Sequence, residues 1–74
     1  MCEEFLKKLG CLIQELRLAR NMDIKEFAKK AKTNNKRVAN IENAKVAAKI
    51  YEIENIAKAL DISALELLKR ADDI

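Results

Sequence analysis

Residues 24–43 read IKEFAKKAKTNNKRVANIEN, and their apolar side chains recur with helical spacing in two short segments. In the first segment, Phe27, Ala28 and Ala31 fall on one side of a helix over about residues 24–31. The other positions of this segment are mostly lysine and glutamate, which suit a solvent-facing side. The pattern therefore predicts one short amphipathic helix.

A second short helix follows a polar interruption. The run at residues 32–34 breaks the apolar pattern, and Val38 and Ile41 resume it over about residues 35–43. Two short helices that meet at a steep angle need a small residue where they pass and a branched apolar residue at their junction. Ala28 and Val38 supply these two residues. The stretch therefore predicts a helix, a short turn and a helix.

The chain before this stretch continues the helical periodicity. A helix is predicted over residues 3–20, with the apolar stripe Phe5, Leu9, Leu12, Ile13, Leu16 and Ala19. Asn21 suits the left-handed turn that ends a helix. Asp23 and Glu26 then form an Asp-x-x-Glu capping box, which predicts the start of the next helix.

Two more helices are predicted towards the C-terminus. The stripe Ile53, Ile56, Ala57 and Leu60 indicates a fourth helix, and Ser63 with Glu66 forms a capping box before a fifth, which holds Leu65, Leu67 and Leu68. Residues 44–49 contain neither glycine nor proline. However, an unbroken helix over residues 35–60 would be about 39 Å long, and so small a domain could not cover its separate apolar patches. A break after the third helix is therefore expected.

The composition agrees with these helices. The chain has 74 residues, no proline, one glycine and no tryptophan, and 50% of its residues are hydrophobic while only 4% are aromatic. Such a core is built from aliphatic side chains, as in helical bundles, and the dipeptides that form hairpin turns are missing. We therefore expect an all-α fold of five helices, with residues 1–74 forming a single domain.

The residue types that catalysis uses are scarce. The chain has no histidine, one serine, one threonine and two cysteines, so we expect no enzyme, no catalytic residue, no metal site and no cofactor. Cys2 and Cys11 lie about 13 Å apart along one predicted helix, too far for a disulfide. We expect reduced thiols and a cytoplasmic protein, since the sequence contains neither a signal-peptide pattern nor a membrane-spanning segment, and no small-molecule substrate is evident.

The charge is distributed unevenly along the chain. Residues 21–49 hold eight basic and three acidic residues, whereas residues 50–74 hold three basic and six acidic residues. A positive segment inside a small domain suits a nucleic-acid backbone. Lysine-rich helix surfaces also occur for solubility alone, so charge by itself leaves both interpretations open.

Taken in order and spacing, these features resemble the lambda-repressor/Cro-like (XRE-type) helix-turn-helix family of DNA-binding regulators over about residues 9–68. The matching residues are Leu9, Ile13, Leu16, Arg17, Phe27, Ala28, Val38, Ile41, Glu42, Asn43, Lys45, the run Ile56-Ala57-Lys58-Ala59-Leu60, Ile62 and Ser63. The resemblance implies a five-helix domain that binds double-stranded DNA and regulates transcription, as a repressor does, with the helix-turn-helix at about residues 24–43.

In this family the third helix enters the major groove and its exposed N-terminal residues touch base edges. The resemblance therefore implies base reading by Asn35, Lys36 and Asn40, with Asn34 and Arg37 beside them. Asparagine pairs with adenine through two hydrogen bonds, and lysine donates to guanine. The alternative is that residues 34–37 only cap and solvate the helix, and for Asn34 alone capping is the better interpretation.

The resemblance also implies contacts to the DNA backbone by Arg17, Lys25, Asn43 and Lys45. Arg17 and Glu42 match a pair that in the family bridges the first and third helices and leaves the arginine near the DNA. An exposed ion pair of this kind would contribute under ~1 kcal/mol, so we expect it to orient the reading helix more than to stabilise the fold.

Three positions depart from the usual family pattern. Ile24 stands where a glutamine often contacts phosphate, Lys32 where glycine fills the turn between helices two and three, and Ala44 where glycine follows the Glu-Asn pair. A left-handed lysine or alanine costs ~1 to 2 kcal/mol, so these two turns either carry strain or take another shape.

One such domain would cover only one half-site, so a homodimer is expected. The candidate interface residues are Ile50, Tyr51, Leu65, Leu68 and Ile74, although ordinary packing of the last helix explains them nearly as well. The alternative function is a protein-interaction module, such as an antitoxin or adaptor subunit, that keeps the fold without reading DNA. The loss of turn glycines is compatible with that alternative.

Overall fold

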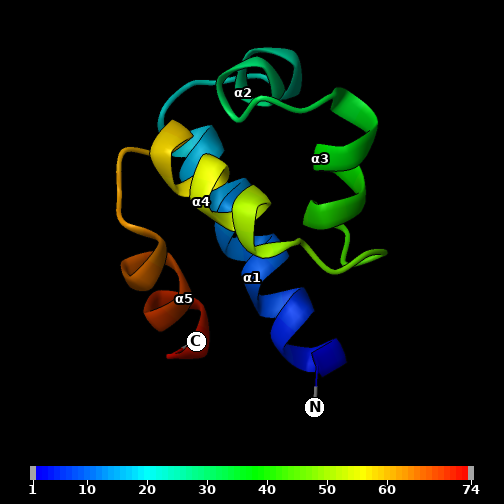
Figure 1. Cartoon of the computed structure of the whole chain (residues 1–74), viewed down its shortest axis with the longest axis vertical. Helices are drawn as coiled ribbons and strands as arrows, with labels where there is room; N and C mark the ends of the chain where they lie inside the picture. Colours follow the sequence, from blue (N-terminus) through cyan, green and yellow to red (C-terminus); the bar gives the residue numbers. More distant parts are fainter. Residues whose placement is uncertain (1, 74) are drawn as a thin grey trace.

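A computed structural model describes residues 2–73 and contains five α-helices and no strand in that range (Figure 1). The helices are α1 (Cys2–Ala19), α2 (Ile24–Lys30), α3 (Asn35–Glu42), α4 (Ile50–Ala59) and α5 (Ala64–Asp72). The predicted all-α fold is confirmed, and the predicted bounds of the first three helices differ from these by one residue at most. The expected break after the third helix is also present, at residues 43–49.

Three helices begin at the polar residues that the sequence predicts as caps. The side chains of Asp23, Asn34 and Ser63 accept hydrogen bonds from backbone amides three residues ahead, at 2.7, 2.8 and 3.0 Å. These bonds satisfy amides that have no partner within the helix. The caps therefore fix where α2, α3 and α5 start.

Four helices share one kind of C-terminal turn. The residue two positions beyond each of α1–α4 is left-handed, with φ of 57° at Asn21, 59° at Lys32, 58° at Ala44 and 62° at Asp61. Each end also carries the paired backbone hydrogen bonds of a Schellman motif, such as Lys45 N to Asn40 O at 2.9 Å and Ala44 N to Ile41 O at 3.1 Å. For Lys32 and Ala44 two possibilities were expected, a left-handed residue under strain or a turn of another shape. The structure shows a left-handed residue at both positions, so both turns carry the strain.

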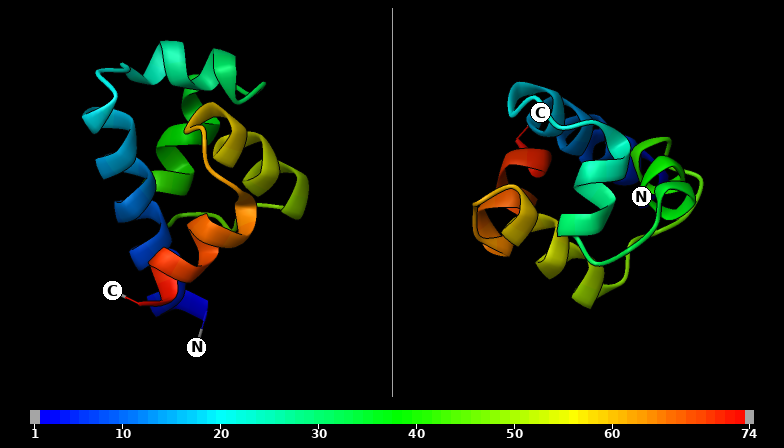
Figure 2. Two further views of the ribbon diagram at one scale, coloured as in Figure 1. Left: turned by 90° about the vertical axis from the view of Figure 1, so that its left-hand side faces the viewer. Right: turned by 90° about the horizontal axis from the view of Figure 1, so that it is seen from above.

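The helices pack as a closed ring in the order α1, α3, α2, α4, α5 and back to α1. Figure 1 shows α2 and α3 at one end of the molecule and α5 beside the N-terminal half of α1 at the other, and Figure 2 shows the same arrangement from two further sides. Each helix contributes a fully buried side chain to the centre, namely Ile13, Phe27, Val38, Ile56 and Leu67. One aliphatic core therefore holds all five helices.

The predicted apolar stripes form this core, with one exception. Leu9, Leu12 and Ile13 of α1 are buried, but Ala19 in the last turn is exposed. Arg17 and Met22 on either side of it are buried, so the packing continues past this turn and Ala19 lies at the edge of the apolar stripe, outside the packed face of α1. The prediction that Ala19 belongs to the core was wrong for this reason.

The single glycine of the chain lies where α1 contacts the last turn of α3. A Cβ atom built on Gly10 would lie 2.5 Å from the carbonyl oxygen of Glu42 and 2.7 Å from that of Ile41. The last turn of α3 therefore rests on the bare backbone of α1.

No helix within residues 2–73 has the length and hydropathy to span a membrane.

Candidate nucleic-acid interface

Helix α3 displays polar side chains at its N-terminal end. Asn35 and Lys36 are exposed, Asn40 one turn later is half-buried, and Asn34 is exposed at the cap. Val38 and Ile41 are buried on the other side of the helix, facing the core. Because one face of α3 is fixed in the core, the opposite face is presented to solvent at the edge of the molecule (Figure 1).

The C-terminal end of α3 is joined to α1 by the predicted Arg17–Glu42 pair. Arg17 Nε donates to Glu42 Oε2 at 2.8 Å and Nη2 to Oε1 at 3.3 Å, while Nη1 donates to the Met22 carbonyl oxygen at 2.9 Å. Both residues are only 8% exposed. We therefore correct one expectation: the pair is buried and not exposed, and three nitrogens of the Arg17 side chain already donate within the protein.

Arg37 is joined to α4 and is not displayed beside Asn35. Its Nε and Nη2 donate to the two carboxylate oxygens of Glu52, both at 2.7 Å, and Nη2 also donates to the Ala47 carbonyl oxygen at 3.3 Å. A two-pronged pair of this kind fixes both groups in one plane. The structure thus gives Arg37 a partner within the protein, which the expectation of base reading by this residue did not include.

Glu52 is the acceptor of three hydrogen bonds at the start of α4. Besides the two from Arg37, its Oε1 accepts one from the Lys49 backbone amide at 2.8 Å. The hydrogen bonds from Arg37 lower the pKa of the Glu52 carboxyl from its ordinary 4.5 to about 2, with a smaller contribution from the Lys49 amide, although burial acts in the opposite direction. The same pairing raises the pKa of Arg37. Both groups are therefore charged at neutral pH.

The remaining candidates for backbone contacts lie on three different segments. Lys25 is in the first turn of α2, Asn43 is the C-terminal cap of α3, and Lys45 follows in the loop before α4. All three are exposed. They therefore remain available to solvent and its ions, unlike Arg17.

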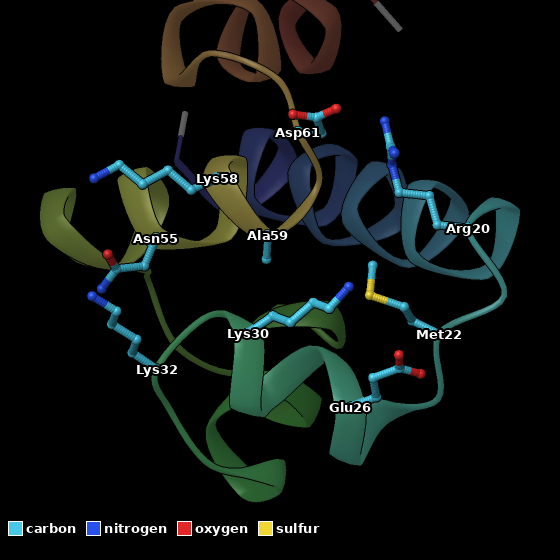
Figure 3. Close-up of a pocket in the computed structure, with 9 residues that line it drawn as sticks. All are labelled: Arg20, Met22, Glu26, Lys30, Lys32, Asn55, Lys58, Ala59 and Asp61. Atoms are coloured by element: carbon cyan, nitrogen blue, oxygen red, sulfur yellow. The ribbon is translucent and has the colours of Figure 1, made fainter.

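A hollow of about 590 Å³ lies on another part of the surface, between α2 and α4 (Figure 3). It is lined by Arg20, Met22, Glu26, Lys30, Lys32, Asn55, Lys58, Ala59 and Asp61. None of the residues predicted to contact DNA lines it.

In the part of the chain that the structure describes, no group of acidic, cysteine or histidine side chains is placed to hold a metal ion.

The candidate interface residues differ in exposure. Ile50 is 80% exposed, and Tyr51 and Leu65 are also exposed. Leu68 is partly buried against the core, and Ile74 lies outside the described residues. Leu18 on α1 is exposed as well and was not among the expected residues.

Sequence reasoning also missed Gly10 and Glu52. A glycine inside a helix costs roughly 1 kcal/mol relative to alanine, so its presence in the middle of a predicted helix was a signal of close backbone approach. Glu52 lies three residues after Lys49, the spacing at which a carboxylate accepts from the amide at a helix start. That spacing would have located the start of α4, but no sequence signal connected Glu52 to Arg37.

Comparison with known proteins places this geometry in context. The model of a family described as helix-turn-helix matches residues 13–67. No curated protein matches the chain.

Several solved structures are similar. They include the clp gene regulator ClgR from Corynebacterium glutamicum, with 16% identity, a TM-score of 0.86 and coverage of 93% of this chain and 73% of that one. The restriction-modification controller protein C.AhdI from Aeromonas hydrophila has 29% identity and a TM-score of 0.81, covering 84% of this chain and 94% of that one. The controller protein C.Esp1396I has 23% identity and a TM-score of 0.83, covering 93% of this chain and 90% of that one. These likenesses confirm the expected fold.

Proposed function

The chain belongs to the helix-turn-helix family of the lambda-repressor/Cro (XRE) type and is a DNA-binding regulator, and from this premise we propose how it reads its DNA. Helix α3 enters the major groove of double-stranded DNA with its N-terminal end foremost. The protein acts by occupying its site, as a repressor does, without catalysis. Three of the similar structures are of proteins named as a gene regulator or as controller proteins, which supports a regulatory role.

The proposed base-reading residues are Asn35, Lys36 and Asn40. Asn35 and Lys36 are exposed in the first turn of α3, and Lys36 and the half-buried Asn40 lie on the face opposite the buried Val38, which supports this assignment. The asparagine amides suit adenine N6 and N7, and the lysine suits guanine O6 and N7, with each good pair discriminating by ~1 to 3 kcal/mol. Asn34 borders this set, but its Oδ1 is already used by the cap of α3.

The proposed phosphate contacts are Lys25, Asn43 and Lys45. Two of them carry a positive charge and all three are exposed, which suits contacts that position the protein without reading sequence. The segment that holds them, residues 21–49, is also the basic part of the chain.

The observation that carries the proposal is the display of polar side chains on the outer face of α3 while its inner face is locked in the core. Selection of bound duplexes from a random library tests it directly. We expect a sequence to be enriched, and we expect Lys36→Ala and Asn40→Ala to weaken binding to that duplex in mobility shifts at two salt concentrations. Unchanged binding in both variants would remove the proposed reading face, and absence of any enriched sequence would favour the protein-interaction alternative.

We also propose that the protein binds DNA as a homodimer. Ile50, Tyr51 and Leu65 expose apolar side chains that the core does not use. A two-fold symmetric sequence in the enriched duplexes, together with a dimeric mass in sedimentation, is the expected result. A monomeric mass with a single unrepeated half-site would contradict it.

A further inference from the structure

We propose that the Arg37–Glu52 pair is a positioning element for DNA recognition, which holds the reading end of α3 and the phosphate-contacting loop in a fixed relation. The proposal rests on the function proposed above and assigns to Arg37 a role through Glu52, in place of contact with bases.

The pair connects three segments that carry proposed DNA contacts or border them. Arg37 stands one residue after Lys36 in the first turn of α3. Its guanidinium donates to Glu52 of α4 and to the Ala47 carbonyl oxygen, in the loop that also holds Lys45. Glu52 in turn accepts from the Lys49 amide, where the loop enters α4. One arginine and one carboxylate thus tie the start of α3, the loop and the start of α4 together.

The geometry of the pair suits positioning. Two parallel hydrogen bonds of 2.7 Å define the direction of the guanidinium as well as its distance, and Glu52 is only 9% exposed. The loop at residues 43–49 has no helical hydrogen-bond ladder of its own to hold it. Because discrimination between bases requires contacts held to within a fraction of an ångström, loosening this loop against α3 should cost selectivity.

The two ends of α3 are therefore held by separate pairs on different neighbours. Arg17 of α1 holds Glu42 at the C-terminal end, and Glu52 of α4 holds Arg37 at the N-terminal end. The first pair is buried, whereas Arg37 keeps 28% of its side chain exposed. The second pair lies closer to Asn35 and Lys36 along the helix and is the one expected to affect reading.

Direct contact of Arg37 with DNA would predict the opposite effect of removing its partner Glu52. If Arg37 left Glu52 to contact DNA directly, removing the Glu52 carboxylate would free the guanidinium and strengthen specific binding. If the pair positions the helix and loop, removing either partner loosens the same contact, so both changes reduce selectivity and the double change adds little.

The test is a double-mutant cycle with Arg37→Ala, Glu52→Ala and the double variant in the full chain. The probes are the duplex that the unchanged protein enriches from a random library and a scrambled duplex of the same length and composition. The quantity compared is the selectivity ratio, which is the dissociation constant for the scrambled duplex divided by that for the enriched duplex. A change of net charge alters affinity for both duplexes and largely cancels in this ratio. We expect each single change to lower the ratio by about tenfold and the double change to lower it no further.

Two further measurements guard the interpretation. Circular dichroism at the assay temperature shows whether each variant is folded. If an alanine variant is unfolded, Arg37→Lys, Glu52→Gln and the corresponding double variant replace the alanine set. Arg70→Ala is the matched control, since it breaks an exposed Arg–Glu pair within α5 and should leave the ratio unchanged.

The outcomes separate the possibilities. A rise of the ratio in Glu52→Ala, with a fall in Arg37→Ala, overturns the proposal in favour of direct contact. Ratios unchanged in folded single variants overturn it in favour of a purely structural pair. If the unchanged protein enriches no sequence, the proposed function itself fails, and the inference built on it fails with it.

Discussion

The two ends of α3 are built in contrasting ways. At the C-terminal end, the carbonyl groups of Ile41 and Glu42 rest on Gly10 and a buried ion pair ties Glu42 to Arg17. At the N-terminal end, Asn35 and Lys36 face solvent, and Arg37, which follows them, pairs with Glu52 of α4. One end is held by the interior and the other is displayed, so substitutions should lower stability most at the first end, while those of Asn35 and Lys36 should affect recognition at the second.

The largest effect is expected from breaking the buried pair. Arg17→Met leaves the Glu42 carboxylate enclosed without its partner and should lower the free energy of unfolding by ~3 to 5 kcal/mol. Urea unfolding monitored by circular dichroism measures this loss. Arg70→Met, which breaks an exposed pair on α5, is the control and should cost under ~1 kcal/mol. Equal losses in the two variants would mean that the contrast between the ends of α3 is wrong.

Gly10→Ala tests the backbone contact at the same end. The added Cβ meets two carbonyl oxygens inside 3.0 Å, so α1 and α3 must separate, and we expect destabilisation by ~1 to 3 kcal/mol despite the better helix propensity of alanine. Thermal unfolding provides the measurement. Gln14→Ala, at an exposed position of α1, should change stability by under ~0.5 kcal/mol. A stabilising effect of Gly10→Ala would show that the contact is looser than described.

At the displayed end, stability and binding should separate. We expect Asn35→Ala and Lys36→Ala to shift the free energy of unfolding by under ~0.5 kcal/mol, because both side chains are exposed. Each should nevertheless weaken binding to the enriched duplex by ~1 to 3 kcal/mol. Chemical unfolding and fluorescence anisotropy with labelled duplex are the two measurements. A variant that loses both properties together would place the residue in the fold instead of the interface.

The pair on the displayed side should make stability depend on pH. The pKa of Glu52 is about 2 in the folded protein and 4.5 ordinarily, so its contribution is complete above pH 4.5 and is lost as the pH falls towards 2. We expect Glu52→Gln to lower stability at pH 7 by ~1 to 2 kcal/mol, a figure reduced for the exposure of Arg37, and to match the unchanged protein near pH 2. Urea unfolding across this range checks it, and a constant difference at all pH values would contradict the assignment.

The smallest effect is expected at the turn that follows α3. Ala44 is left-handed with a φ of 58°, a conformation that glycine adopts without steric cost. Ala44→Gly should raise the free energy of unfolding by ~0.5 to 1 kcal/mol, since relief of strain exceeds the added flexibility of the unfolded chain. Differential scanning calorimetry is suited to so small a change. A lower melting temperature would indicate that the alanine methyl contributes packing.

Local patterns were sufficient to predict the helices but not all of their contacts. Asp23, Asn34 and Ser63 cap their helices through bonds only three residues long, so the sequence contains the whole interaction. The Arg37–Glu52 contact spans 15 residues and depends on how α4 packs, and no spacing rule encodes that. The burial of Arg17 escaped prediction for the same reason: its exposure depends on how closely α3 approaches α1, which Gly10 permits.

The ring of helices has a consequence for how the molecule opens. Each helix leans on two neighbours, and each places a side chain in the common centre, so no helix can detach without exposing apolar surface on both sides. Subglobal opening should therefore be rare, and the slowest-exchanging amides of all five helices should share one opening free energy equal to that of complete unfolding. Recognition of DNA would then be carried out by a unit that melts as a whole.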